Sequence, residues 1–251
     1  GVRQPVEYGI VDSGIDSRHA ALQRTLLDQR AFRQGEERIG DRVGHGTAVA
    51  GIIHRICPAA RFLSAKVTSP KGTGNLDDVV RALGWLKRTE PDVLVCCALV
   101  PSSLTRNSVL GALLQSFVDR GVLVIIPAEY DQRIGDEPID AVWVGADGSV
   151  APGHAQALAS ARGLRVPMSV NADKTRFEAV QPAGWAAMDS VAVSVGIAAA
   201  CAGLLIRAAR NISDQQVSVD LVKQALKSGC RDGGVLCVQT AVEAFLEELQ
   251  A

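Results

Sequence analysis

Aromatic residues, net charge and long apolar runs are all scarce in this sequence, and each shortage excludes a class of protein. Phe, Trp and Tyr make up 4% of the 251 residues, and the formal net charge is −1. A near-neutral chain has no electrostatic reason to bind nucleic acid or an anionic membrane, so we expect neither as a partner. No uninterrupted apolar run reaches the roughly 18 residues that a membrane-spanning helix needs. The first residues, GVRQP, contain no apolar region of a secretory signal.

The chain has six cysteines, but the sequence contains no C-x-x-C pair and no group of cysteines and histidines at the spacing of a zinc site. Four of the six lie in apolar runs, where cysteine acts as a small hydrophobic residue. Cys230 and Cys237 flank a hairpin-like turn, which allows either a disulfide between them or free thiols in a reducing compartment. Carboxylates do not cluster at the spacing of a calcium-binding loop. We therefore expect neither a metal nor a cofactor.

Small apolar residues are abundant, and their pattern predicts the fold class. Apolar residues reach 47%, enough to bury a sizeable core. Strand-like and helix-like segments alternate without an internal repeat or a linker, which predicts one α/β domain over residues 1–251, with a mostly parallel sheet and helices on both faces. Strands are expected near 6–11, 61–67, 92–100, 122–126, 141–145 and 164–170, and helices near 20–27, 45–56, 76–89, 108–120, 190–210 and 240–249.

Three segments carry residues that suit acyl-transfer chemistry. Residues 44–51 (GHGTAVAG) place His45 at a helix entrance, where the flanking glycines leave the imidazole uncrowded. The apolar strand at 6–11 ends in Asp12, and open α/β sheets carry their chemistry at the carboxyl ends of the strands. Far downstream, Ser190 precedes a helix of small residues. Asp, then His, then Ser is the chain order of one known catalytic triad.

These motifs resemble those of the subtilisin-like serine peptidases (subtilases), and the resemblance extends over nearly the whole chain. Residues 12–16 (DSGID) are similar to the family's aspartate motif, and residues 44–51 to its histidine motif. Residues 57–67 resemble the strand that follows, 72–74 the G-x-G edge that binds substrate, and 91–103 the strand that carries S-L-G. The resemblance implies the three-layer subtilisin-like fold.

By this resemblance Asp12 orients His45, His45 is the general base and then the general acid, and Ser190 is the nucleophile. An imidazole with an ordinary pKa of about 6.5 is suited to accept the proton of a serine hydroxyl. The family's G-T-S-M-A-x-P is replaced here by residues 188–194 (MDSVAVS), which keep only the serine and the alanine two residues later. Ser194 is therefore an alternative nucleophile, and a helix cap is the alternative role for Ser190.

The segment that carries the family's oxyanion-stabilising asparagine also differs. After the strand at 122–126, the sequence reads Pro127, Ala128, Glu129, Tyr130 where the family has A-A-A-G-N. Loss of that donor costs roughly 10²–10³ in kcat in subtilisin. A protonated Glu129, the hydroxyl of Tyr130, or backbone donors alone are the alternatives for stabilising the oxyanion.

The substrate groove is altered as well. Ala98, Leu99 and Val100 stand where the family has S-L-G, so a valine side chain narrows the pocket for the substrate residue before the cleaved bond. Pro127 lies in the wall of the same pocket, by the same resemblance. The glycine-rich edge can still pair with a substrate backbone as an added strand. The expected substrate-binding residues are Gly72, Thr73, Gly74, Ala98, Leu99, Val100 and Pro127.

Together these features predict a serine endopeptidase that needs no cofactor and processes a peptide or protein precursor, because the altered pocket and oxyanion segment disfavour broad digestion. The alternative is a subtilase-fold pseudoenzyme that binds a peptide or partner protein in the same groove. Intact Asp12 and His45 favour the enzyme, whereas Glu129 and Val100 favour the alternative. A domain within a larger multidomain protein is a further alternative.

The short segment 51–58 leaves no room for the calcium loop that is common in secreted relatives. By the same resemblance, we expect no structural metal there. This feature and the cysteines in apolar runs favour a cytoplasmic location.

Overall fold

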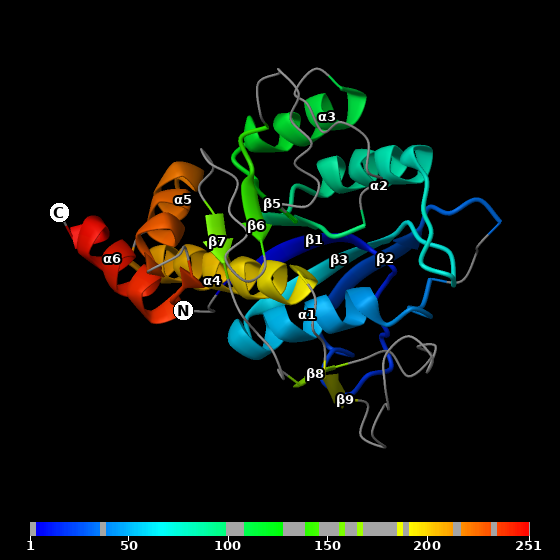
Figure 1. Cartoon of the computed structure of the whole chain (residues 1–251), viewed down its shortest axis with the longest axis horizontal. Helices are drawn as coiled ribbons and strands as arrows, with labels where there is room; N and C mark the ends of the chain where they lie inside the picture. Colours follow the sequence, from blue (N-terminus) through cyan, green and yellow to red (C-terminus); the bar gives the residue numbers. More distant parts are fainter. Residues whose placement is uncertain are drawn as a thin grey trace.

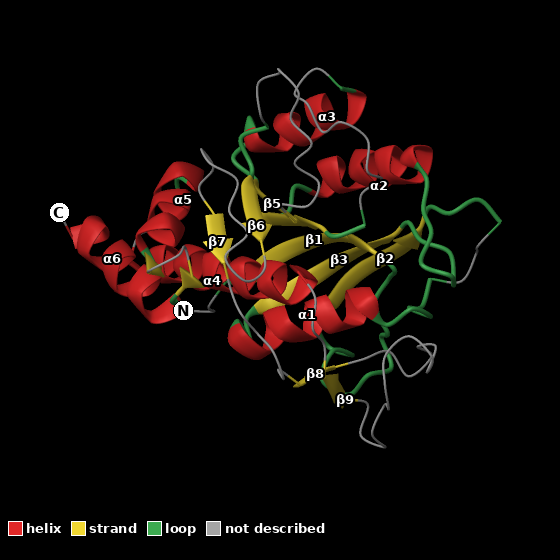
Figure 2. Cartoon of the chain, in the orientation of Figure 1, coloured by secondary structure: helices red, strands yellow, loops and turns green. Residues whose placement is uncertain are grey.

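The computed structural model describes residues 4–35, 39–98, 108–127, 139–145, 156–158, 165–167, 185–187, 191–212, 217–231 and 235–250. These residues form three layers, with a central sheet between two layers of helices (Figures 1 and 2). The predicted three-layer α/β fold with a mostly parallel sheet is confirmed.

The sheet has the strand order β10-β11-β7-β6-β5-β4-β1-β3-β2. Neighbouring strands are parallel from β2 to β11, and only β10 is antiparallel to its neighbour. A separate antiparallel ribbon is formed by β8 and β9. The strands are β1 (Val6–Asp12), β2 (Leu26–Ala31), β3 (Ala60–Lys66), β4 (Val93–Cys96), β5 (Leu123–Pro127), β6 (Val142–Gly145), β7 (Gln156–Leu158), β8 (Arg165–Pro167), β9 (Trp185–Ala187), β10 (Cys230–Arg231) and β11 (Val235–Leu236).

The helices divide between the two faces of the sheet. α1 (His45–Ile56), α4 (Val191–Ile212), α5 (Val219–Ser228) and α6 (Val238–Gln250) pack in one core, and α2 (Leu76–Thr89) and α3 (Val109–Val118) pack in the other. Alternate residues of one strand enter the two cores, as Ile10 and Val11 do in β1. Both faces are therefore buried, which explains why the central strands are nearly continuous apolar runs.

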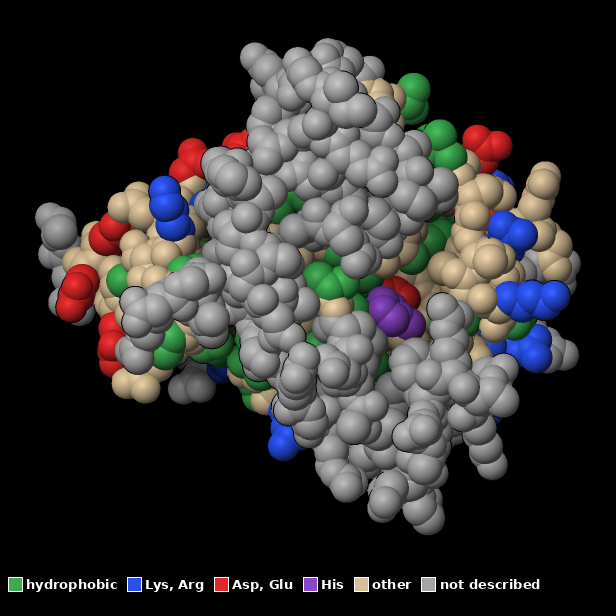
Figure 3. Space-filling view, in the orientation of Figure 1, with side chains coloured by type: hydrophobic (Ala, Val, Ile, Leu, Met, Phe, Trp, Pro, Cys, Tyr) green, Lys and Arg blue, Asp and Glu red, His purple; other side chains and the backbone are tan. Residues whose placement is uncertain are grey.

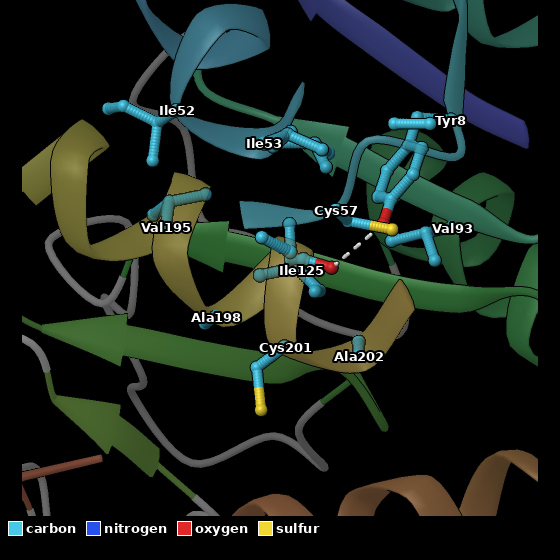
Figure 4. Packing of buried hydrophobic residues seen from close by; sticks show 14 of the residues in the cluster. Tyr8, Ile52, Ile53, Cys57, Val93, Ile125, Val195, Ala198, Cys201 and Ala202 are labelled. Carbon is cyan, nitrogen blue, oxygen red and sulfur yellow. Dashed lines mark hydrogen bonds between the residues drawn. The ribbon is translucent and has the colours of Figure 1, made fainter. Parts of the chain in front are cut away.

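Helices α1 and α4 lie against each other and run in the same direction (Figures 1 and 4). A Cβ atom on Gly196 would lie 3.1 Å from Cγ2 of Ile52, and one on Gly203 would lie 3.3 Å from Sγ of Cys57. The contact point therefore moves from Ile52 in α1 to Cys57 at its C-cap as it moves from Gly196 to Gly203 along α4. The N-terminal ends of the two helices consequently lie at the same end of the pair.

α4 is long and apolar enough to span a membrane by length and composition. However, 72% of its most apolar 18-residue window is buried within the fold. It packs against α1, α5, α6 and the central strands, and the glycines above allow these close contacts. We interpret α4 as the central helix of the core.

The helix predicted at 20–27 was wrong. Hydrogen bonds from Leu22 N to the His19 carbonyl and from Thr25 N to the Leu22 carbonyl form successive turns, and β2 begins at Leu26. β2 is an edge strand whose residues are only partly buried. Because the segment contains polar side chains, it lacks the continuous apolar run that identifies a buried strand in the sequence. Pairing with β3 determines its strand conformation, whatever the local sequence favours.

Candidate active site

Asp12 is the last residue of β1, an interior strand that lies third from the β2 edge of the sheet. β1 lies between β3 and β4, and the Asp12 backbone pairs with Lys66 across the parallel ladder. Its side chain is 2% exposed, and Oδ1 accepts a hydrogen bond from Ser13 N at 2.6 Å. The sequence prediction of a carboxylate at the carboxyl edge of the sheet is confirmed.

His45 is the first residue of α1, and its ring meets Asp12. Nδ1 lies 2.9 Å from Oδ1 and 2.8 Å from Oδ2 of Asp12. When Asp12 is ionised, Nδ1 donates the hydrogen bond and Nε2 becomes the acceptor of the ring. The His45 side chain is 27% exposed, so the buried carboxylate orients an imidazole that solvent can reach. Figure 3 shows a histidine side chain at the surface with acidic atoms beside it.

Gly46 allows α1 to approach the end of β1. A Cβ atom at this position would lie 2.3 Å from the Gly14 carbonyl oxygen and 3.1 Å from Cβ of Asp12. Gly14 itself has φ 101°, a left-handed conformation that favours glycine. The two glycines thus permit the close approach of backbone segments that brings Asp12 and His45 together.

Asp41 is a residue of this site that the sequence analysis missed. It is fully buried, and its carboxylate accepts hydrogen bonds from Val43, Gly44 and Thr47. Burial raises the pKa of Asp41 above its ordinary value, and the hydrogen bonds from Thr47 and Gly44 oppose part of this rise. An acidic residue shortly before a helix start is a capping signal that could have identified it.

The two candidate nucleophiles differ in what the structure describes. Ser190 lies outside the described residues, which resume at Val191, the first residue of α4. Ser194 lies in α4 and is 1% exposed. A nucleophile must contact the substrate carbonyl, so burial disfavours Ser194.

The glycine-rich loop after β3 is described in full. Ser69 N donates to the Thr73 carbonyl, and Gly72 N donates to the Ser69 carbonyl, so the loop closes on itself. Within the described part of the chain, the N–H and C=O groups of Gly74 have no hydrogen-bond partner, and this residue is exposed. Gly74 therefore presents an open backbone edge that suits pairing with an extended peptide.

The other predicted groove residues are only partly described. Ala98 N donates to the Val11 carbonyl at 3.2 Å, which places Ala98 beside the strand that ends in Asp12. Pro127 is the buried last residue of β5. Leu99 and Val100 of the predicted groove lie outside the described residues, as do the oxyanion candidates Glu129 and Tyr130.

No disulfide joins any of the six cysteines, all of which lie in the described part of the chain, so the bridge that the spacing of Cys230 and Cys237 allowed is not formed. Cys96 lies next to the site, and burial together with the nearby Asp12 charge raises the pKa of its thiol. Among the described residues, no group of three or more His, Cys, Asp or Glu side chains is placed to hold a metal ion.

Comparison with known proteins relates the chain to subtilisin-type proteases. No model of a protein family matches it. It is 28% identical to subtilisin DY of Bacillus licheniformis over 109 residues, which are 40% of this chain and 39% of that protein. It is 25% identical to the major intracellular serine protease of Bacillus subtilis over 146 residues, which are 53% and 44% of the two chains. The chain thus spans less than half the length of these curated relatives.

Solved structures extend the likeness to nearly the whole fold. A lanthipeptide protease superposes with a TM-score of 0.72 at 19% identity, covering 95% of this chain and 87% of the other. A cold-adapted subtilisin-like serine proteinase superposes with a TM-score of 0.69 at 15% identity, covering 93% and 85%. In its motifs, its fold and its sequence relatives, the chain is thus similar to the subtilisin-like (subtilase) proteases, at low sequence identity.

Proposed function

We propose that the chain is a serine endopeptidase in which Asp12, His45 and Ser190 form the catalytic triad. The observation that carries this proposal is the hydrogen bond between the buried Asp12 carboxylate and Nδ1 of the accessible His45 imidazole. This arrangement fixes the tautomer that a general base needs and stabilises the imidazolium that forms during the reaction.

The packing of α1 on α4 supports Ser190 as the third member. Ile52 lies seven residues after His45, and Gly196 lies five residues after Val191. At about 1.5 Å of rise per residue, the contact between them is about 10 Å from the start of α1 and about 8 Å from the start of α4. Because the helices run in the same direction, the start of α4 at Val191 lies at the same end of the pair as His45, and this arrangement supports the proposal.

In the proposed reaction, Nε2 of His45 takes the proton of the Ser190 hydroxyl as its oxygen attacks the scissile carbonyl carbon. His45 then donates this proton to the leaving amine, and an acyl-enzyme remains. A water molecule, deprotonated by His45, releases the acyl group and restores the serine. Asp12 stays ionised throughout. The N-terminal ends of α1 and α4 both carry partial positive charge, which favours the developing oxyanion.

We further propose that the substrate is a peptide or protein precursor cleaved at few positions. The open backbone edge at Gly74 supports an extended peptide as the ligand. The replacements at Val100 and Glu129 support a narrow pocket and slow turnover, rather than broad digestion. A peptide substrate also agrees with the name of one structural neighbour, the lanthipeptide protease.

The test is labelling with a serine-reactive fluorophosphonate, followed by mass spectrometry of the modified peptide. We expect an adduct on Ser190 in the wild type and in Ser194→Ala, and none in Ser190→Ala. Ser194→Ala is the matched control because it removes the other candidate hydroxyl in the same segment. An adduct on Ser194, or none at any pH, would exclude the proposed nucleophile.

A pseudoenzyme that binds a peptide is the second candidate, favoured by the carboxylate at Glu129 in place of an oxyanion donor. It predicts peptide binding that Ser190→Ala leaves unchanged, without any cleavage product. The cytoplasmic location and membership of a larger multidomain protein stay predictions.

A further inference from the structure

The first turn of α1 is capped by a residue that lies outside the helix. Gly44 occupies the N-cap position with φ 92° and provides no capping side chain. Asp41 supplies the missing acceptor: Oδ1 accepts from Val43 N at 2.9 Å and from Gly44 N at 2.8 Å. Oδ2 accepts from the backbone N of Thr47 at 3.0 Å and from its hydroxyl at 2.6 Å. Four donors therefore converge on one buried carboxylate.

The same first turn is tied to the segment that follows Asp12. The Thr47 hydroxyl oxygen, which donates to Asp41, accepts a hydrogen bond from Asp16 N at 3.0 Å. Gly46 N donates to Oγ of Ser13 at 3.0 Å. The carboxyl end of β1, the loop before α1 and the start of α1 are thus joined by one set of buried hydrogen bonds.

We propose that Asp41 is a positioning residue for the catalytic pair, holding the start of α1 where Nδ1 of His45 meets Asp12. This inference rests on the proposed peptidase function. His45 is the first helical residue and lies between Gly44 and Gly46, which give the backbone wide conformational freedom. The flexible backbone on both sides of His45 does not by itself hold the imidazole against Asp12. The hydrogen bonds to the Asp41 carboxylate restrict the conformation of this backbone.

Asp41→Asn is the variant that tests this role. It keeps the size of the side chain but replaces one carboxylate oxygen with an NH₂ group. An NH₂ group cannot accept from Thr47 N or from the Thr47 hydroxyl. Ser108→Ala is the matched control, because the Ser108 hydroxyl caps α3, on the other face of the sheet, by accepting from Gly111 N at 3.0 Å. Both variants lose a helix cap, but only one loses a cap at the catalytic pair.

The first readout is hydrolysis of p-nitrophenyl acetate at a temperature at which circular dichroism shows both variants to be folded. We expect Asp41→Asn to lower kcat about 10- to 100-fold with little change in KM, because small misplacement of a catalytic group acts mainly on the chemical step. Ser108→Ala should lower the urea midpoint but leave kcat unchanged. Equal kcat values for Asp41→Asn and the wild type would overturn the proposal.

The second readout does not depend on activity, so it separates this inference from the proposed function. The His45 Nδ1 proton, held by Asp12, should give a low-field ¹H NMR signal that Asp12→Ala removes. We expect the signal to persist in Ser190→Ala and Ser108→Ala and to be lost through exchange in Asp41→Asn. A persistent signal in Asp41→Asn would overturn the positioning role even if no ester were hydrolysed.

Should Asp41→Asn fail to fold, the Thr47 hydroxyl offers a second test. Thr47→Ser keeps the hydroxyl that links Asp41 to Asp16, whereas Thr47→Ala removes it and leaves the backbone cap in place. We expect Thr47→Ala to weaken the low-field signal and kcat, and Thr47→Ser to restore both. No difference between the two variants would overturn the proposal.

Discussion

Substituting Gly46 by alanine should separate the catalytic pair while leaving both of its side chains in the sequence. The added Cβ atom would lie 2.3 Å from the Gly14 carbonyl oxygen and 3.2 Å from Cγ of Asp12. Ordinary contacts begin at 3.4 Å, so α1 and the turn after β1 must move apart by about 1 Å. The Nδ1–Oδ2 distance between His45 and Asp12, now 2.8 Å, would then exceed hydrogen-bonding range.

A misplacement of about 1 Å typically costs about 100-fold in rate, which corresponds to about 2.7 kcal/mol of activation free energy. Overpacking at a backbone contact should also lower the free energy of unfolding by about 1–3 kcal/mol. The assay is hydrolysis of p-nitrophenyl acetate together with urea unfolding. Gly84→Ala in α2 is the control, because its Cβ would lie within 4 Å of no described atom beyond its chain neighbours and the nearby backbone of its own helix, and helix propensity favours alanine by about 0.5–1 kcal/mol. A folded Gly46→Ala protein with the kcat of the wild type would refute the reasoning.

Three further changes test other parts of the structure. Asp12→Asn should lower kcat by about 10⁴, because the amide favours the wrong His45 tautomer; a fall of less than tenfold in ester hydrolysis would contradict a triad. Glu129→Asn should raise ester hydrolysis by about 10-fold or more if the oxyanion site lacks only a donor; an unchanged or lower rate would assign Glu129 another role. Tyr8 is fully buried, and desolvation raises the pKa of its hydroxyl well above its ordinary value. The unfolded state therefore loses this proton first as pH rises, so the wild type should lose about 1.4 kcal/mol of stability per pH unit above about pH 10, and Tyr8→Phe should not. Urea unfolding of both proteins between about pH 9 and pH 11 measures this, and a pH-independent difference between them would contradict it.

Local sequence pattern was sufficient for the elements that are buried or strongly periodic. β1 is an apolar run because both of its faces are covered, and the helix predicted at 45–56 matches α1. The expected carboxyl-edge position of Asp12 followed from the same reasoning, since parallel strands carry their chemistry there. The sequence also predicted α2, whose apolar residues recur at helical spacing and whose N-cap, Asn75, accepts from Asp78 N.

Contacts between distant segments were not predictable in this way. The Tyr8 hydroxyl donates to the Ala199 carbonyl at 3.2 Å (dashed line in Figure 4). It occupies space that only a glycine at position 203 leaves free, since a Cβ atom there would lie 1.7 Å from the hydroxyl oxygen. Neither residue has a local pattern that indicates this contact, because the constraint arises only when α4 packs on β1.

The sequence by itself determined the fold class, the order of the catalytic candidates and the position of Asp12 at a strand end, because hydrophobic periodicity and short motifs are local properties. Tertiary structure decided that the strand at Leu26 forms the edge of the sheet. It also made Asp41 the cap of α1, because this role requires the left-handed Gly44 and the first turn of the helix to be in place. The distance between Asp12 and His45 is likewise a tertiary property, since it depends on how closely two backbone segments approach.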